Sequence, residues 1–256
     1  MRIRPGNAQH QGARDSQQDS FGFSNLEDRA FTGHAGCLGV VADGMGGMAH
    51  GGAASATAVQ VILREYGAKS AEETIQDALD RAVKRANEAV VAMAEAAGVP
   101  REVGTTLAAA VVHGAEMHWI SVGDSRVYLC RRGRLTQVTV DHVYAAELDA
   151  RLADGEISAD RAETDPDRDA LTSHLGQATL GAVDRSVTPL PLLEGDRIVV
   201  CSDGIYRALS PAEIAGALSG APQDVCEALV SRIVAKQLAK QDNMTVIVLA
   251  LDARRS

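Results

Sequence analysis

The chain has 256 residues, the length of one α/β domain, and 46% of them are hydrophobic, enough for a sizeable core. Aromatic residues make up only 3%, so this core must be mostly aliphatic and rich in alanine. A formal net charge of -9 does not suit the phosphate backbone of nucleic acid, which requires clustered lysine and arginine. The charge is compatible with simple solubility or with carboxylates gathered to bind metal.

Neither the first residues nor any later run has the apolar character of a signal peptide or a membrane span. The four cysteines form no CxxC pair, and three of them lie in apolar, strand-like runs, so we expect buried thiols in a reducing compartment. These features predict a cytoplasmic protein with one domain over 1–256 and with neither nucleic acid nor membrane as a partner. Nothing in the sequence requires more than a monomer. The cysteines are Cys37, Cys130, Cys201 and Cys226.

The first half of the chain predicts a buried strand, two helices and two hairpins, in that order. Residues 38–42 form a short, branched apolar run that ends at an aspartate, which is typical of a buried strand. Apolar residues recur every three to four positions over 53–66 and 74–97, which indicates amphipathic helices. Short turns at 113–116 and 131–134 then join apolar runs, and strands joined in this way pair antiparallel.

The second half opens with a segment of different composition. Residues 141–169 are dense in Asp, Glu, Arg and Ala, and predict short mobile helices laid over the body of the protein. Beyond them, the apolar runs at 198–201 and 244–251 predict strands, and 222–239 predicts a helix with proline in its first turn. Helices and hairpins that alternate in blocks favour packed sheets with helices outside.

Five aspartates lie where an apolar run stops or is about to start. Strand ends that present carboxylates are suited to Mg²⁺ or Mn²⁺, which bind oxygen ligands and retain several waters. Glycine beside the aspartate lets backbone and water approach closely. Any one of these aspartates alone is better explained as a turn or helix cap, but five together favour a metal site. They are Asp19, Asp43, Asp124, Asp203 and Asp242.

The aspartates belong to an ordered set of motifs that spans nearly the whole chain. Val41-Ala-Asp-Gly-Met-Gly-Gly47 resembles the most characteristic motif of the type 2C, metal-dependent protein serine/threonine phosphatases (the PPM family). Its methionine is common in the bacterial members. The remaining motifs follow in the family's order: Arg14–Asp19, Gly104–Thr106, Gly123–Arg126, Ser202–Gly204 and Asp242–Asn243.

The resemblance implies an α+β fold, a four-layer αββα sandwich of two antiparallel sheets flanked by helices, with the metal site at one end. Residues of about 141–170 correspond to a flap beside that site. It also implies two core ions, Mn²⁺ or Mg²⁺, and a third, weaker ion. Asp43 would bridge the core ions, and Asp203 and Asp242 would ligate one of them. The other would use the Gly44 carbonyl and waters, with Asp19 nearby.

Further site residues are implied in the same way. Asp124 with Asp203 matches the position of the third ion, and Arg14 matches the residue that grips the substrate phosphate. Gln18 stands where many members carry glutamate, so the adjacent ion should be held more loosely. Asn243 would orient Asp242 or a water. The general acid stays open between a metal-associated water and His50.

The implied activity is hydrolysis of phosphoserine and phosphothreonine proteins by a water or hydroxide shared by two cations, opposing a bacterial serine/threonine kinase. No phosphoenzyme is needed in this scheme. One alternative is a pseudo-phosphatase, a regulatory or binding module on the same fold, which lost aspartates would favour. The other is a phosphoesterase of small molecules, which a deep, closed pocket would favour.

Overall fold

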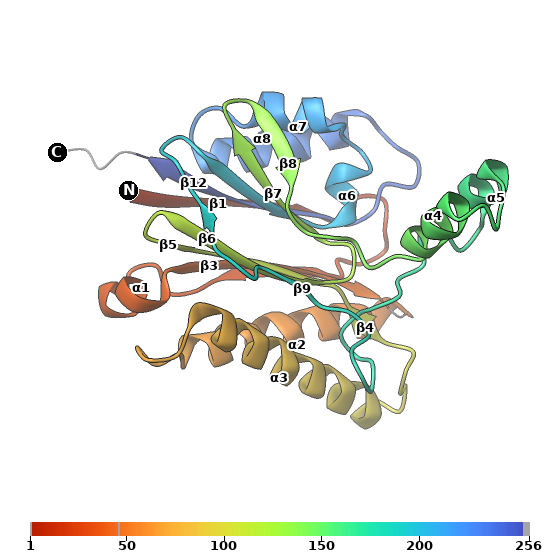
Figure 1. Cartoon of the computed structure of the whole chain (residues 1–256), viewed down its shortest axis with the longest axis horizontal. Helices are drawn as coiled ribbons and strands as arrows, with labels where there is room; N and C mark the ends of the chain where they lie inside the picture. Colours follow the sequence, from red (N-terminus) through yellow and green to blue (C-terminus); the bar gives the residue numbers. More distant parts are fainter. Residues whose placement is uncertain (1, 46, 253–256) are drawn as a thin grey trace.

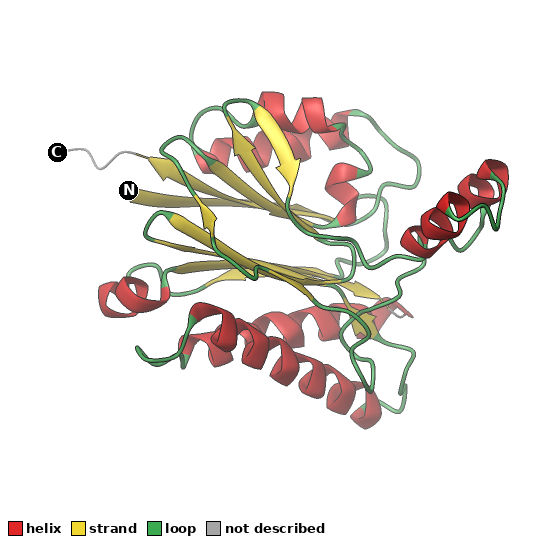
Figure 2. Cartoon of the chain, viewed as in Figure 1, coloured by secondary structure: helices red, strands yellow, loops and turns green. Residues whose placement is uncertain are grey.

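The computed structural model describes residues 2–45 and 47–252, and they form four layers (Figures 1 and 2). Two β-sheets face each other in the middle, and helices cover both outer faces. Every strand pairing is antiparallel among the residues described. The predicted αββα sandwich and its antiparallel sheets are therefore confirmed.

The first sheet has five strands and the second has seven. The first runs in the order β1 (Arg2–His10), β12 (Met244–Asp252), β11 (Arg197–Cys201), β7 (Arg126–Arg131) and β8 (Arg134–Gln137). The second runs in the order β10 (Leu190–Pro191), β6 (Glu116–Val122), β5 (Leu107–His113), β3 (Cys37–Met45) and β2 (Asp19–Phe23). Two short strands complete it: β4 (Gly104–Thr105) beside β3, and β9 (Asp184–Arg185) beside β6.

Strand alternation divides the core into three layers, because successive side chains point to opposite faces of a sheet. On β3, Leu38 and Val40 pack toward the helices, whereas Val41 packs between the sheets. On β12, Val248 packs toward the other helices and Ile247 packs between the sheets. The inner strands are therefore apolar on both faces, as strands covered on both sides must be.

Helices α2 (Gly47–Gly67) and α3 (Ile75–Ala96) cover the second sheet, and α6 (Asp203–Tyr206), α7 (Pro211–Ala217) and α8 (Pro222–Ala235) cover the first (Figure 1). The short α1 (Arg29–Ala35) lies at one end of the second sheet. The flap contains α4 (Ala145–Ala153) and α5 (Ala159–Thr164). In Figure 1 it leaves the sandwich at the end that carries α6 and β4, opposite the end where the first and last strands reach the termini.

Most predicted elements are confirmed, although the short helices α1, α6 and α7 were not predicted, and three further differences have physical causes. Strand β1 was not predicted, because its sequence is polar and contains Pro5, which an edge strand tolerates. Helix α8 ends at Ala235 instead of residue 239, and Gln237 has a φ of 49°, outside the helical range. The flap helices do not lie over the body but extend away from it. They pack mainly on each other, with Leu148 and Ala162 buried.

The four cysteines are buried and form no disulfide, as predicted. Within the described residues no helix combines the length and the apolar character needed to cross a membrane.

Candidate metal centre and active site

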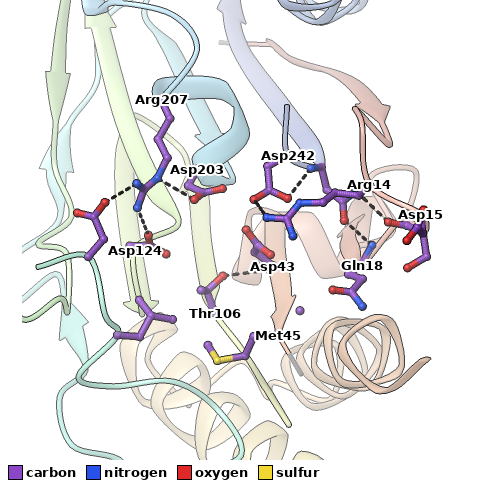
Figure 3. Close-up of a pocket in the computed structure, with 15 residues that line it drawn as sticks. Arg14, Asp15, Gln18, Asp43, Met45, Thr106, Asp124, Asp203, Arg207 and Asp242 are labelled. Carbon is purple, nitrogen blue, oxygen red and sulfur yellow. Dashed lines mark hydrogen bonds and ion pairs between the residues drawn. The ribbon is translucent and has the colours of Figure 1, made fainter. Parts of the chain in front are cut away.

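A cavity of about 510 Å³ opens at the end of the sandwich from which the flap leaves. Figure 3 shows Asp43 near its middle, between the Arg14–Asp242 pair on one side and Arg207 with Asp203 on the other. The structure thus brings most of the predicted site residues together from distant parts of the chain. Those that line the cavity are Arg14, Gln18, Asp43, Gly44, Asp124, Asp203, Asp242 and Asn243.

Asp43 occupies the cavity because of its place on β3. It continues the face of the strand that Val41 presents to the space between the sheets, where the apolar layer gives way to the cavity. Its backbone is fixed on both sides: its N–H donates to Thr106 Oγ1 at 3.0 Å, and its carbonyl accepts from Thr105 Oγ1 at 2.9 Å. The Gly104–Thr106 motif therefore holds Asp43 in position.

Asp19 lies behind Asp43, directly opposite it in the β2–β3 pairing. Asp19 is buried, and its Oδ2 accepts a hydrogen bond from Ser202 Oγ at 2.7 Å. Its Oδ1 has no hydrogen-bond partner among the described residues, and the same holds for Oδ1 of Asp203. Buried carboxylate oxygens without partners are costly, and a bound cation is one of the few ways to satisfy them.

Burial and the neighbouring carboxylates raise the pKa values of the aspartates in the site. Burial raises the pKa of Asp43 well above its ordinary value, and the neighbouring charges of Asp19 and Asp203 raise it further. Burial is also the main cause that raises the pKa of Asp19 to about 6 and that of Asp203 to about 7. Without a cation, these groups therefore keep their protons to a higher pH than ordinary aspartates do.

Arg14 and Asp242 form an ion pair at the rim, with 2.6 Å between Nη2 and Oδ2. The Arg14 side chain is 60% exposed, so one substrate group could reach it directly. The Asn243 side chain fixes the loop that carries Arg14: it donates to the carbonyls of Gln11 and Ser16 and accepts from the N–H of Gln18. Asp242 accepts from the backbone N–H of Asn243 at 2.8 Å, so Asn243 orients Asp242 through its backbone.

Gly44 lies where no side chain would fit. A Cβ there would approach the Gly51 carbonyl oxygen to 2.0 Å and that of Gln18 to 2.7 Å. The Gly44 N–H donates to the Gln18 carbonyl at 3.2 Å, and Ser55 Oγ donates to the same carbonyl at 2.5 Å. These contacts join β3 to the loop before β2, so that the Gly44 backbone borders the cavity.

The opposite side of the cavity is formed by residues around Asp124. The Tyr206 hydroxyl lies 3.0 Å from the Asp124 carbonyl and 3.1 Å from its Oδ2. His142 is buried, and its Nδ1 accepts from the N–H of Gly123 at 3.0 Å, so it supports the turn that carries Asp124. Arg126 pairs with Asp141 at 2.6 Å and lies 3.5 Å over the Tyr206 ring.

The residues fit a hydrated divalent-cation site. Its donors are carboxylate and backbone oxygens, the ligands that Mg²⁺ and Mn²⁺ prefer, and within the described part of the chain two buried carboxylate oxygens lack hydrogen-bond partners. Among the described residues, no three His, Cys, Asp or Glu side chains converge closely enough to enclose one ion. That spacing suits ions that keep several waters.

Sequence reasoning missed Arg207 and Asp169, which also line the cavity. Arg207 follows Asp203 by four residues, a helical spacing that brings the two side chains together on α6. Asp169 carries no comparable signal, because only the folding of the flap places it there. His50 does not line the cavity, so the structure gives no support to it as a general acid.

Comparison with known proteins adds to this geometry. Residues 7–241 match the protein phosphatase 2C family. The serine/threonine phosphatase stp of Listeria innocua is 32% identical over 211 residues, which cover 81% of this chain and 82% of that protein. The Streptococcus agalactiae serine/threonine phosphatase has a similar structure, with a TM-score of 0.83, 26% identity and coverage of 98% of this chain and 100% of the other.

A third relative was solved with metal. The catalytic domain of the serine/threonine protein phosphatase PstP, in complex with two manganese ions, superposes with a TM-score of 0.76 at 26% identity. The match covers 98% of this chain and 99% of that domain.

Proposed function

The chain belongs to the protein phosphatase 2C family and is a metal-dependent protein serine/threonine phosphatase of bacterial type, and on this premise we propose that the cavity around Asp43 is its active site. The observation that carries the proposal is the convergence of carboxylates from β2, β3, α6 and the segment before β12 at one end of the sandwich. Two of these carboxylates have a buried oxygen with no hydrogen-bond partner in residues 2–45 and 47–252.

We assign the metal ligands as follows. Two ions, Mn²⁺ or Mg²⁺, would share Asp43, with Asp203 and Asp242 holding one ion, and the Gly44 carbonyl and Asp19 serving the other. Bound divalent ions supply Lewis acidity that polarises phosphate oxygens and makes water a stronger acid. The amide of Gln18 is neutral, so this side of the site has one negative charge fewer than it would have with a glutamate. The ion beside Gln18 should therefore be the more weakly bound of the two.

Arg14 binds the substrate phosphate in this scheme. It lies at the rim with most of its side chain exposed, and its ion pair with Asp242 occupies one arm of the guanidinium. A guanidinium suits the oxygens of a tetrahedral phosphate because it donates in two parallel directions. Arg14 also places positive charge beside the carboxylates of Asp43, Asp203 and Asp242, which would otherwise repel the phosphate.

The substrates in this proposal are phosphoserine and phosphothreonine proteins, with a serine/threonine kinase supplying the phosphate. A wide, polar cavity with Arg14 at its exposed rim suits a residue presented on a protein surface better than a small molecule that must be enclosed. Free buried cysteines suit a reducing compartment such as the cytoplasm. We further infer a single catalytic domain over 1–256 that acts as a monomer.

The test is phosphate release from a phosphothreonine peptide with added Mn²⁺, with EDTA, and with Asp203→Asn. We expect release that requires Mn²⁺, is lost with EDTA and returns when Mn²⁺ is restored in excess. Asp203→Asn should shift the Mn²⁺ dependence to concentrations more than about tenfold higher, because an amide is a neutral and poorer ligand. Release that survives EDTA and the substitution would refute the metal assignment.

Replacing Arg14 by alanine should weaken substrate binding while leaving the metals in place. Because charge-assisted hydrogen bonds to phosphate are lost, KM for the phosphopeptide should rise by roughly 10- to 100-fold. The KM of Arg14→Lys should fall between those of the wild-type chain and Arg14→Ala, since lysine keeps the charge but not the paired donors. Steady-state kinetics and a titration with Mn²⁺ check both parts. An unchanged KM in Arg14→Ala would remove Arg14 from the phosphate site.

A further inference from the structure

Arg207 carries a positive charge among three carboxylates at the side of the cavity nearest the flap. Its Nε lies 2.8 Å from Asp203 Oδ2, its Nη1 lies 2.7 Å from Asp169 Oδ2, and its Nη2 lies 3.6 Å from Asp124 Oδ2. Figure 3 shows the guanidinium reaching from α6 toward Asp203 and Asp124. We name Arg207 with Asp124, Asp169 and Asp203 the Arg207 cluster.

The two carboxylates assigned above to a third ion are already engaged in this cluster. Asp124 is only 10% exposed, and its Oδ2 faces both Arg207 and the Tyr206 hydroxyl. The two oxygens of the Asp203 carboxylate have different surroundings. Oδ2 pairs with Arg207, whereas Oδ1 is buried and has no partner among the described residues. Asp203 thus keeps one oxygen for a core ion and gives the other to the arginine.

Charge gives the same result. The Asp124 charge raises the pKa of Asp203, and the Arg207 charge, within ion-pair reach of both carboxylates, lowers the pKa of each. A divalent ion at the same place would have to displace a guanidinium that three carboxylates hold, or bind beside a positive charge. Either arrangement would weaken the binding of the ion.

Arg207 also connects α6 to the flap. The base of the flap is closed by backbone pairing: the N–H of Tyr144 donates to the Ala170 carbonyl at 2.9 Å, and that of Thr172 donates to the His142 carbonyl at 2.9 Å. Asp169 directly adjoins this base. Through Asp169, the position of the flap depends on the same guanidinium that holds Asp124 and Asp203.

Building on the proposed function, we propose that Arg207 is a positioning residue that takes the place of a third cation at Asp124 and Asp203 and docks the flap through Asp169. The chain then binds two divalent ions at this site and not three. The third ion expected from the sequence is replaced by a side chain of the protein itself.

The first measurement counts bound Mn²⁺ by isothermal titration and by metal analysis after gel filtration. The wild-type chain should bind two ions, and Arg207→Ala should bind a third at millimolar Mn²⁺. Arg207→Lys should stay at two, because it keeps the charge. Three ions in the wild-type chain, or no added ion in a folded Arg207→Ala, would overturn the cation replacement.

The second measurement follows the flap by hydrogen exchange over 145–169 in metal-free protein. Arg207→Ala and Asp169→Asn should both speed exchange there, by roughly two- to fivefold, as expected for a partly exposed ion pair. Asp169→Asn should leave the Mn²⁺ count at two. Arg151→Ala, which removes the Arg151–Glu156 pair within the flap, is the matched control and should change neither the count nor the exchange at Asp169. Equal exchange in all four proteins would overturn the docking role.

Circular dichroism establishes that each variant is folded before these comparisons, and Arg207→Lys and Asp169→Asn serve if Arg207→Ala is not. The two proposals fail differently. A wild-type chain that binds no Mn²⁺ would refute the proposed active site. One that binds three ions and is active would refute only the role of Arg207.

Discussion

Asp43→Asn is expected to lower phosphatase activity more than any other single substitution in this chain. Asp43 is the one carboxylate assigned to both ions, and its surroundings already combine burial with the charges of Asp19 and Asp203. Substitution of residues that only support metal ligands costs roughly 10- to 100-fold, so loss of a shared ligand should exceed about 100-fold. Phosphate release from a phosphothreonine peptide at saturating Mn²⁺ measures this loss.

The same substitution should stabilise the metal-free protein, which separates it from simple unfolding. Asparagine keeps the shape of Asp43 but removes a charge that burial and neighbouring carboxylates make costly. The melting temperature without metal should therefore rise, most clearly at alkaline pH. Asp224→Asn, on the exposed first turn of α8 and away from the cavity, is the matched control and should leave activity unchanged. Substantial Mn²⁺-dependent activity in Asp43→Asn would contradict the assignment.

The second large effect is a pH-dependent loss of stability in metal-free protein. The pKa of Asp19 is raised to about 6 and that of Asp203 to about 7, above the ordinary value of 3.8, so the folded state binds more protons than the unfolded state. Stability then falls as pH rises from about 4 through 7, the range between the unfolded and folded pKa values. The metal-free melting temperature should drop between about pH 5 and pH 8.

Saturating Mn²⁺ should remove this drop, because the ions replace the protons as partners of the carboxylates. The gain in melting temperature on adding Mn²⁺ should therefore be larger at about pH 8 than at about pH 5. Burial lowers the pKa of His142, whose contribution has the opposite sign, so the difference with and without Mn²⁺ isolates the carboxylates. An equal gain at both pH values would count against a carboxylate site.

The aspartates assigned to the metals could be predicted because each follows from local sequence. A branched apolar run that ends at Asp43 predicts both a buried strand and a carboxylate at its end, and the alternation of β3 then fixes the side to which the carboxylate belongs. Asp19 is similar, since it begins β2 opposite Asp43. In these cases the pattern that builds the strand also places the ligand.

The parts that could not be predicted depend on contacts between distant segments. Strand β1 is polar and contains proline, and only its pairing with the apolar β12 makes it a strand. The flap is joined to the site by Arg207 and Asp169, which are 38 residues apart and share no motif. The side-chain contacts of Asn243 have the same origin, because they bind a loop more than two hundred residues away.

Diffraction from a crystal soaked in Mn²⁺, measured at an energy where manganese scatters anomalously, tests the central assignment most directly. We expect two anomalous peaks, both beside the Asp43 carboxylate, one of them also beside Asp203 and Asp242, and neither between Asp124 and Arg207. Well-ordered Asp43, Asp203 and Asp242 with no peak between them would contradict the account.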